Sequence, residues 1–267
     1  MALHREAPRG GGFLPDQMLS PPPSSIASGS TVAAALPHPR AHPLKPGGAK
    51  ESAFIRFVDQ GILKIERRYA KRGTSMADKN EDASSRGYEN FEELVQDVEK
   101  LFELIWVSGT PSLQVPYLLT LASMVEQYIS SFPAAPQPTF RLLDRFDLAF
   151  ASLLQGRHVE TGETLPGFDT GRRVTGTEKV RMKSIVERTR GVVAEVMSGH
   201  DDEEEASRVE DVTDLDTADE MDIDESIAES GEQFTDIEMS VAKVYDRTVV
   251  ELGDTIGNTP IGIISND

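Results

Sequence analysis

The feature that most constrains the fold is a stripe of apolar side chains with helical spacing between residues 91 and 105. Each apolar residue has another one three or four positions away, which places them on one face of an α-helix. The pattern stops before Gly109, and glycine is favoured just past a helix C-terminus. The stripe consists of Phe91, Leu94, Val95, Val98, Leu101, Phe102 and Ile105. It predicts an amphipathic helix that must bury one side against other helices.

Four other segments show the same spacing, and proline or glycine separates them. The first begins at Glu51 and ends before Gly73. Another begins at Pro111, directly after a threonine that suits the N-cap position. The remaining two are expected over residues 140–154 and from Thr177 onward.

The segment 110–132 is apolar on nearly all sides, so we expect it to be the central and most buried helix. Strands require a period of two residues, and apart from the short stretch IGIIS no segment alternates in that way. The sequence therefore predicts an all-α fold, a helical bundle of about five helices over residues 51–199.

The flanks of this bundle differ from it in composition. Residues 1–50 are rich in Pro, Gly, Ser and Ala, which predicts a disordered arm. Within this arm, RAHPLKP at residues 40–46 matches the basic Pro-rich pattern that aromatic-lined grooves recognise, although a plain linker has the same composition. On the C-terminal side we expect an acidic disordered segment over 200–232, an amphipathic helix over 233–252 and a flexible tail over 253–267.

Negative charge is concentrated in one block. Residues 201–240 contain 18 acidic residues and one basic residue, Arg208, so they carry −17 of the formal net charge of −18. A block of like charges stays hydrated and attracts basic partners rather than nucleic acid. Hydrophobic residues spaced among the acids indicate an interaction segment that folds on a partner.

The residues that common catalytic and metal sites require do not occur together in this sequence. With no cysteine, thiol catalysis and zinc–thiolate sites are excluded. Two G-x-x-x-x-G spacings begin at Gly162 and Gly171, but neither is followed by the Lys and Ser/Thr of a phosphate-binding loop. The acidic block lacks the glycine of a calcium-binding loop. We therefore predict no catalytic, cofactor-binding or metal-binding residues, no cofactor and no ATPase activity.

Basic residues cluster around the start of the fifth predicted helix, between residues 172 and 190. This cluster forms either a solvated helix face or a surface that binds the phosphates of nucleic acid or an acidic partner. Its members are Arg172, Arg173, Lys179, Arg181, Lys183, Arg188 and Arg190.

The amphipathic helix expected over 233–252 is a candidate for binding a partner protein, because its apolar residues recur at helical spacing after the acidic block. The stripe consists of Phe234, Ile237, Val241, Tyr245 and Leu252.

Several stretches resemble a family of uncharacterised fungal proteins. They include SSIASGSTVAAALPHPRAHPLKPGGAKESAFIRFVDQGIL, LIWVSGTPSLQVPYLL, LLQGRHVETGETLPGF and TEKVRMKSIVERTR, and the resemblance covers residues 24 to about 195. Some members of that family carry a meiotic recombination label. The label implies a RecA-like ATPase, which the missing phosphate-binding residues contradict. The resemblance therefore implies a nuclear setting, and no functional residues follow from it.

These observations favour a non-enzymatic helical adaptor or assembly subunit, in the nucleus, with the cytoplasm as the alternative location. We expect protein partners that are basic or helical. No apolar run approaches the roughly 18 residues that span a bilayer, so we expect no membrane contact. The first alternative is a nucleic-acid-associated accessory factor, in meiotic recombination or DNA repair, that uses the basic helix over 172–190. An enzyme of unrecognised type is the third reading.

Overall fold

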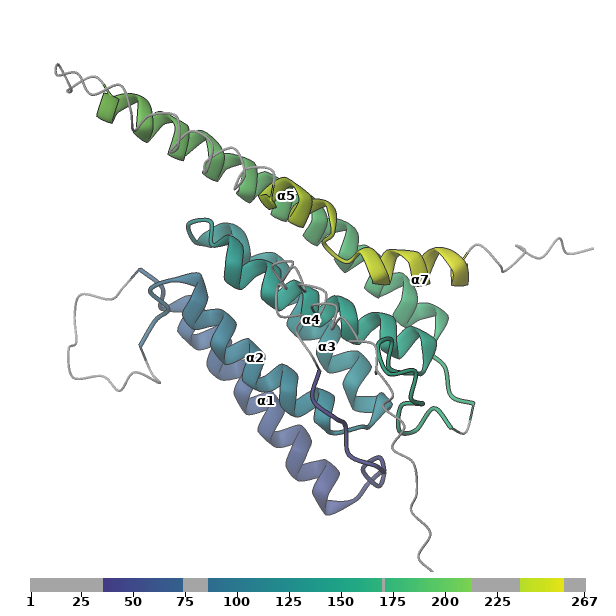
Figure 1. Ribbon diagram of the computed structural model, residues 1–267. Coiled ribbons are helices and arrows are strands. Elements are labelled where there is room, and N and C mark those ends of the chain that lie inside the picture. Colours follow the sequence, from purple (N-terminus) through teal and green to yellow (C-terminus); the bar gives the residue numbers. More distant parts are fainter. Residues whose placement is uncertain (1–35, 74–85, 170, 213–235, 257–267) are drawn as a thin grey trace, which may run out of the picture. The chain divides into compact units, whose positions relative to one another are not determined.

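The computed structural model describes residues 36–73, 86–169, 171–212 and 236–256, and in these ranges it is built of helices joined by loops (Figure 1). The all-α prediction is confirmed, and the β-pairing among the described residues is a single isolated bridge between Arg157 and Thr164. None of the described helices is long and apolar enough to cross a membrane. The helices are α1 (Ala49–Ala70), α2 (Phe91–Val107), α3 (Pro111–Tyr128), the 3-10 turn η1 (Ile129–Ser131), α4 (Pro136–Gln155), α5 (Gly176–Val212) and α7 (Asp246–Ile256).

Local sequence accounts for several helix ends. The Asn90 side chain accepts a hydrogen bond from the Glu93 N–H and so caps α2. Gly156 ends α4 in the left-handed conformation, at φ 72°. At the start of α5, Thr175 and Glu178 bond to each other's backbone N–H, which is a capping box. The N-cap of α5 is therefore Thr175, two residues before Thr177, from which we expected this helix to begin.

The apolar stripe of α2 lies at the centre of the core, as its spacing predicts. Leu94, Val98 and Phe102 are fully buried, and α2 packs against α1, α3 and α4. Gly61 lets α1 lie close to α2, since a Cβ atom at this position would be only 2.5 Å from Leu101 Cδ2 of α2. Helix α3 in turn packs against α5, which completes the bundle.

Helix α4 is more enclosed than α3, contrary to our expectation that the segment 110–132 would be the most buried. Every residue from Arg145 to Leu154 is buried. The reason is a long-range contact: α7 packs against α4, on which α2 and α3 also pack (Figure 1). Periodicity within α4 alone does not reveal this additional neighbour.

Part of the arm that we expected to be disordered is held against the bundle. Leu36 and Leu44 are buried. The Trp106 indole N–H donates to the Pro37 carbonyl at 2.8 Å, and the Leu44 N–H donates to the Thr110 hydroxyl at 2.8 Å. Buried apolar side chains and a satisfied indole donor thus fix residues 36–48, whereas residues 1–35 lie outside the described residues.

The C-terminal elements also differ from the expected boundaries. Helical backbone in α5 continues to Val212, past residue 199 where we expected the bundle to end. The single helix expected over 233–252 is two helical segments, residues 236–242 and α7. They are separated at Tyr245, whose φ of 57° is left-handed and whose ring is buried. The change of direction places this ring beside Phe150, at a centroid distance of 6.1 Å.

A buried arginine joins α1 to α2. Arg68 donates to the Asp97 carboxylate at 2.6 Å, to Glu93 at 3.0 Å and to the Arg86 carbonyl at 2.9 Å. Burial alone would raise the pKa of Asp97, but hydrogen bonds from Arg68 and Lys100 and the charges of both outweigh burial and lower this pKa. Because each donor has a partner, this ion-pair cluster fixes the end of α1.

The buried carboxylate of Asp147 attaches α7 to α4. One of its oxygens accepts hydrogen bonds from the N–H and the hydroxyl of Thr248, and the other accepts from the N–H and the guanidinium of Arg247. The first N–H groups of a helix have no partner inside the helix, so this carboxylate acts as an N-terminal cap supplied by another helix. Burial raises the pKa of Asp147, and these hydrogen bonds act against that rise.

Substitution of Gly156 by alanine should destabilise the fold by about 1–2 kcal/mol. A Cβ atom at this left-handed position would lie 2.9 Å from the Phe168 ring. The matched control is Gly191→Ala in the exposed interior of α5, where nothing lies within 4 Å. This control should be neutral or stabilise the protein by up to about 1 kcal/mol. Urea unfolding followed by circular dichroism measures the free energy of unfolding of both variants. Equal effects of the two variants would contradict the role of Gly156 as the left-handed end of α4.

Asp147→Asn should lower the free energy of unfolding by about 2–4 kcal/mol, because an amide nitrogen would face donors that now meet a carboxylate. The control is Asp144→Asn, which removes the charge of the neighbouring and more exposed partner of Arg247. Its cost should stay below about 1 kcal/mol. Urea titrations of both variants and the native chain measure the free energies of unfolding. If Asp147→Asn lowers this free energy no more than Asp144→Asn does, the capping contact is unimportant for stability.

Candidate functional site

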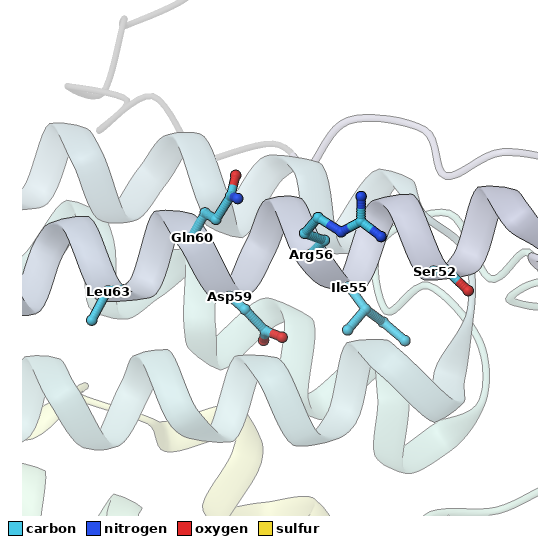
Figure 2. A pocket seen from close by; sticks show the side chains of 6 residues that line it. All are labelled: Ser52, Ile55, Arg56, Asp59, Gln60 and Leu63. Carbon is cyan, nitrogen blue, oxygen red and sulfur yellow. The ribbon is translucent and has the colours of Figure 1, made fainter.

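One hollow of about 420 Å³ lies on the outer side of α1, and all the side chains that line it belong to that helix (Figure 2). Small-molecule sites gather polar groups from several elements, which this hollow does not do. Among the described residues, no group of His, Asp or Glu side chains is arranged to hold a metal ion. The lining residues are Ser52, Ile55, Arg56, Asp59, Gln60 and Leu63.

This α1 outer face, defined as the lining residues together with Phe57, combines apolar and charged groups. Figure 2 shows Ile55, Asp59 and Leu63 along one edge of the helix. Phe57 and Leu63 are 59% and 42% exposed, although the opposite side of α1 is buried through Val58 and Ile65. Single exposed apolar side chains are common on protein surfaces, and two on one helix make this helix a candidate for contact with another protein.

Asp59 is held in place by a neighbouring helix. The hydroxyl of Tyr117 in α3 donates to its carboxylate at 2.8 Å. Burial, together with this hydrogen bond and the Asp59 charge, raises the pKa of Tyr117 to about 12. The acidic group on the α1 outer face therefore has a defined position. The sequence did not predict this face, because the periodicity of a helix alone does not show which of its apolar residues stay exposed.

The residues of the basic cluster predicted over 172–190 have different surroundings. Arg188 pairs with Glu126 of α3 at 3.3 Å. Arg190 donates to the Val244 carbonyl at 2.6 Å and so holds the C-terminal segment. Lys183 lies 3.8 Å from Glu187 within α5. These contacts are made within the chain, although Lys183 and Arg188 stay half-exposed. Lys179 and Arg181 lie on the first turns of α5.

Arg172 and Arg173 line a second hollow, of about 310 Å³, together with Arg157. Sequence reasoning did not select Arg157, because it precedes the basic cluster and directly follows α4. The antiparallel bridge between Arg157 and Thr164 places both residues at this hollow. The structure thus brings two of the predicted basic residues together with a third that no sequence motif marks.

The stripe predicted to bind a partner is largely used inside the chain. Tyr245 and Leu252 are buried in the core, and Ile237 and Val241 pack against it. Phe234 lies outside the described residues. The reason for the difference is the Asp147 cap, which fixes α7 with its apolar side against α4. The exposed large apolar residues of this segment are Met239, Val249 and Val250.

A comparison with known proteins finds a fungal relative of this chain. An uncharacterised protein of Schizosaccharomyces pombe is 25% identical over 147 residues, which cover 53% of this chain and 76% of that protein. No solved structure matches the chain.

The comparison with protein families does not support the meiotic recombination label that some members of the similar fungal family carry. The model of a family described as TFB6, subunit 11 of the general transcription factor TFIIH, matches residues 87–253, which include α2, α3, α4, all of α5 and most of α7. Because this match extends over more than half of the sequence, the chain belongs to the TFB6 family.

Proposed function

We propose that the protein is a non-enzymatic assembly subunit of a TFIIH-type transcription-factor complex in the nucleus. The observation that carries this proposal is the family match over residues 87–253, which extends through the helices that form most of the core. A family described as a TFIIH subunit implies protein partners within a complex. The proposal therefore gives the bundle the task of presenting surfaces to other subunits.

The placement of the ionisable groups supports an assembly role. Burial raises the pKa values of Asp147, Tyr88 and Tyr245, and each of these groups lies between packed elements. Perturbed pKa values mark catalytic sites when the groups line a cleft, but ion-pair and packing networks perturb them as well. In this protein Asp147 caps a helix and Tyr88 bonds to the Asp97 of the ion-pair cluster, so both act within the scaffold.

We assign the contact with a partner subunit to the α1 outer face. Its exposed Phe57 and Leu63 offer apolar anchors, and Arg56 and Asp59 offer one charge of each sign. The partner that fits is an apolar segment with an acidic and a basic residue at matching positions. Helix α1 precedes the residues that the family model matches, so this assignment rests on the geometry of α1 and not on the family match.

The proposed assembly can be tested by affinity purification of the tagged full chain from fungal nuclear extract at about 0.5 M salt, where screening suppresses weak charge contacts. We expect identified TFIIH subunits to co-purify. A Phe57→Glu and Leu63→Glu double variant should reduce their recovery by about tenfold or more, since it places charges in an apolar contact.

The control double variant is Val180→Glu and Val250→Glu, which changes two other exposed apolar residues, 64% and 56% exposed, to the same acid. It should recover the same subunits as the native chain. Absence of TFIIH subunits with the native chain would overturn the assembly proposal. Their full recovery with the α1 variant would overturn only the assignment of the contact to α1.

A further inference from the structure

The second hollow, which we call the arginine hollow, gathers three guanidinium groups from two separate stretches of chain. Arg157 comes from the loop after α4, and Arg172 and Arg173 come from the segment before α5. Asp169 is the carboxylate among the lining residues. We propose that this hollow binds the phosphate of a phosphorylated serine or threonine in a peptide. The proposal goes beyond the assembly role, because it concerns another surface and holds whether or not α1 contacts a TFIIH subunit.

The position of Arg157 is fixed by the backbone. Around its bridge to Thr164, the His158 N–H donates to the Glu163 carbonyl at 2.8 Å and the Leu165 N–H donates to the Gly156 carbonyl at 3.0 Å. These bonds make a small hairpin that is anchored directly on the end of α4. A binding group on such a hairpin loses little conformational entropy when a ligand binds.

Buried residues on both sides fix the other two arginines. Phe168 is buried and packs against Gly156, where any larger residue would collide with its ring. Val174 is buried in the core immediately after Arg173. Arg172 and Arg173 therefore lie in a short connection between two anchors, and their side chains remain exposed at the hollow.

The charge of the arginine hollow matches that of a phosphate group. Three guanidinium groups and the Asp169 carboxylate leave a net charge of +2. Among the described residues, none of the three arginine side chains has an ion pair with a carboxylate. A phosphorylated serine or threonine carries a charge of about −1.5 to −2 at neutral pH. Guanidinium groups bind phosphate oxygens through paired hydrogen bonds. Thr164, whose hydroxyl is a neutral donor, also lines the hollow.

A single phosphate fits this hollow better than a nucleic-acid strand does. Its volume of about 310 Å³ lies at the lower end of the range for small-ligand sites. Exposed carboxylates of Glu160 and Glu163 lie on the same hairpin, where they would repel the neighbouring phosphates of a strand. Nucleic-acid binding instead needs a basic track, and Arg188 and Arg190 are engaged in internal contacts.

The test uses purified full-length protein and fluorescence anisotropy. The probe is a short labelled peptide of glycine, alanine and serine that contains one phosphoserine. We expect saturable binding that inorganic phosphate displaces, and binding of the unphosphorylated peptide that is weaker by about tenfold or more. An Arg172→Ala and Arg173→Ala double variant should weaken phosphopeptide binding by a similar factor. Arg157→Lys, which keeps the charge but loses the fork geometry, should weaken it by a smaller factor.

The matched control is the Arg181→Ala and Lys183→Ala double variant, which removes the same net charge from an exposed part of α5. It should change the affinity less than about twofold, since charges away from the hollow act only through a screened field. Equal weakening by both double variants would overturn the proposal in favour of a general charge effect. So would equal binding of the two peptides, or tighter binding of a single-stranded oligonucleotide through Arg172 and Arg173. Thermal unfolding that matches the native chain confirms that each variant is folded.

Discussion

The fold depends on a carboxylate that is almost completely removed from water. Ionised Asp147 would be costly in an apolar core by itself, and burial accordingly raises its pKa. The cost is offset because the same two oxygens accept the N–H groups of Arg247 and Thr248, which otherwise have no partner at the start of α7. The cap thus gives hydrogen-bond partners both to the buried carboxylate and to the N–H groups at the start of α7. With α7 in place, α4 is enclosed on its remaining side, and Tyr245 is fixed in a left-handed conformation that the chain would otherwise avoid.

Charged residues elsewhere in the bundle also act between helices. Arg141 and Arg145 of α4 pair with Glu99 of α2, and Arg68 of α1 pairs with Asp97 of α2. Exposed pairs of this kind contribute little stability, whereas removal of one partner from a buried pair is costly. These contacts therefore fix which helices lie side by side more than they strengthen the core.

How much the sequence reveals depends on the range of the contact involved. The stripe of α2 was predictable because neighbours three and four residues apart share a helix face, and proline and glycine mark the limits of most helices. The docking of α7 was not, because an apolar stripe has the same spacing whether it meets the chain's own core or a partner. For the same reason Arg157 was missed: only folding brings it beside Arg172. Leu36 and Leu44 sit in a Pro-rich composition typical of disorder, and their burial depends on surfaces of α2 and α3 that lie far along the chain.

The separation of Asp147 from Thr248, 101 residues, has a consequence for the order of folding. Helices α2, α3 and α4 are joined by short connections, so their contacts form after the closure of small loops. The pairing of α4 with α7 must wait for a much larger loop to close, and long-range contacts form slowly. During that interval one apolar side of α4, including Phe150, stays open to water and to other chains. A chain of this family would then be most prone to aggregate before its last helix docks, and conditions that keep α7 close to the bundle would protect it.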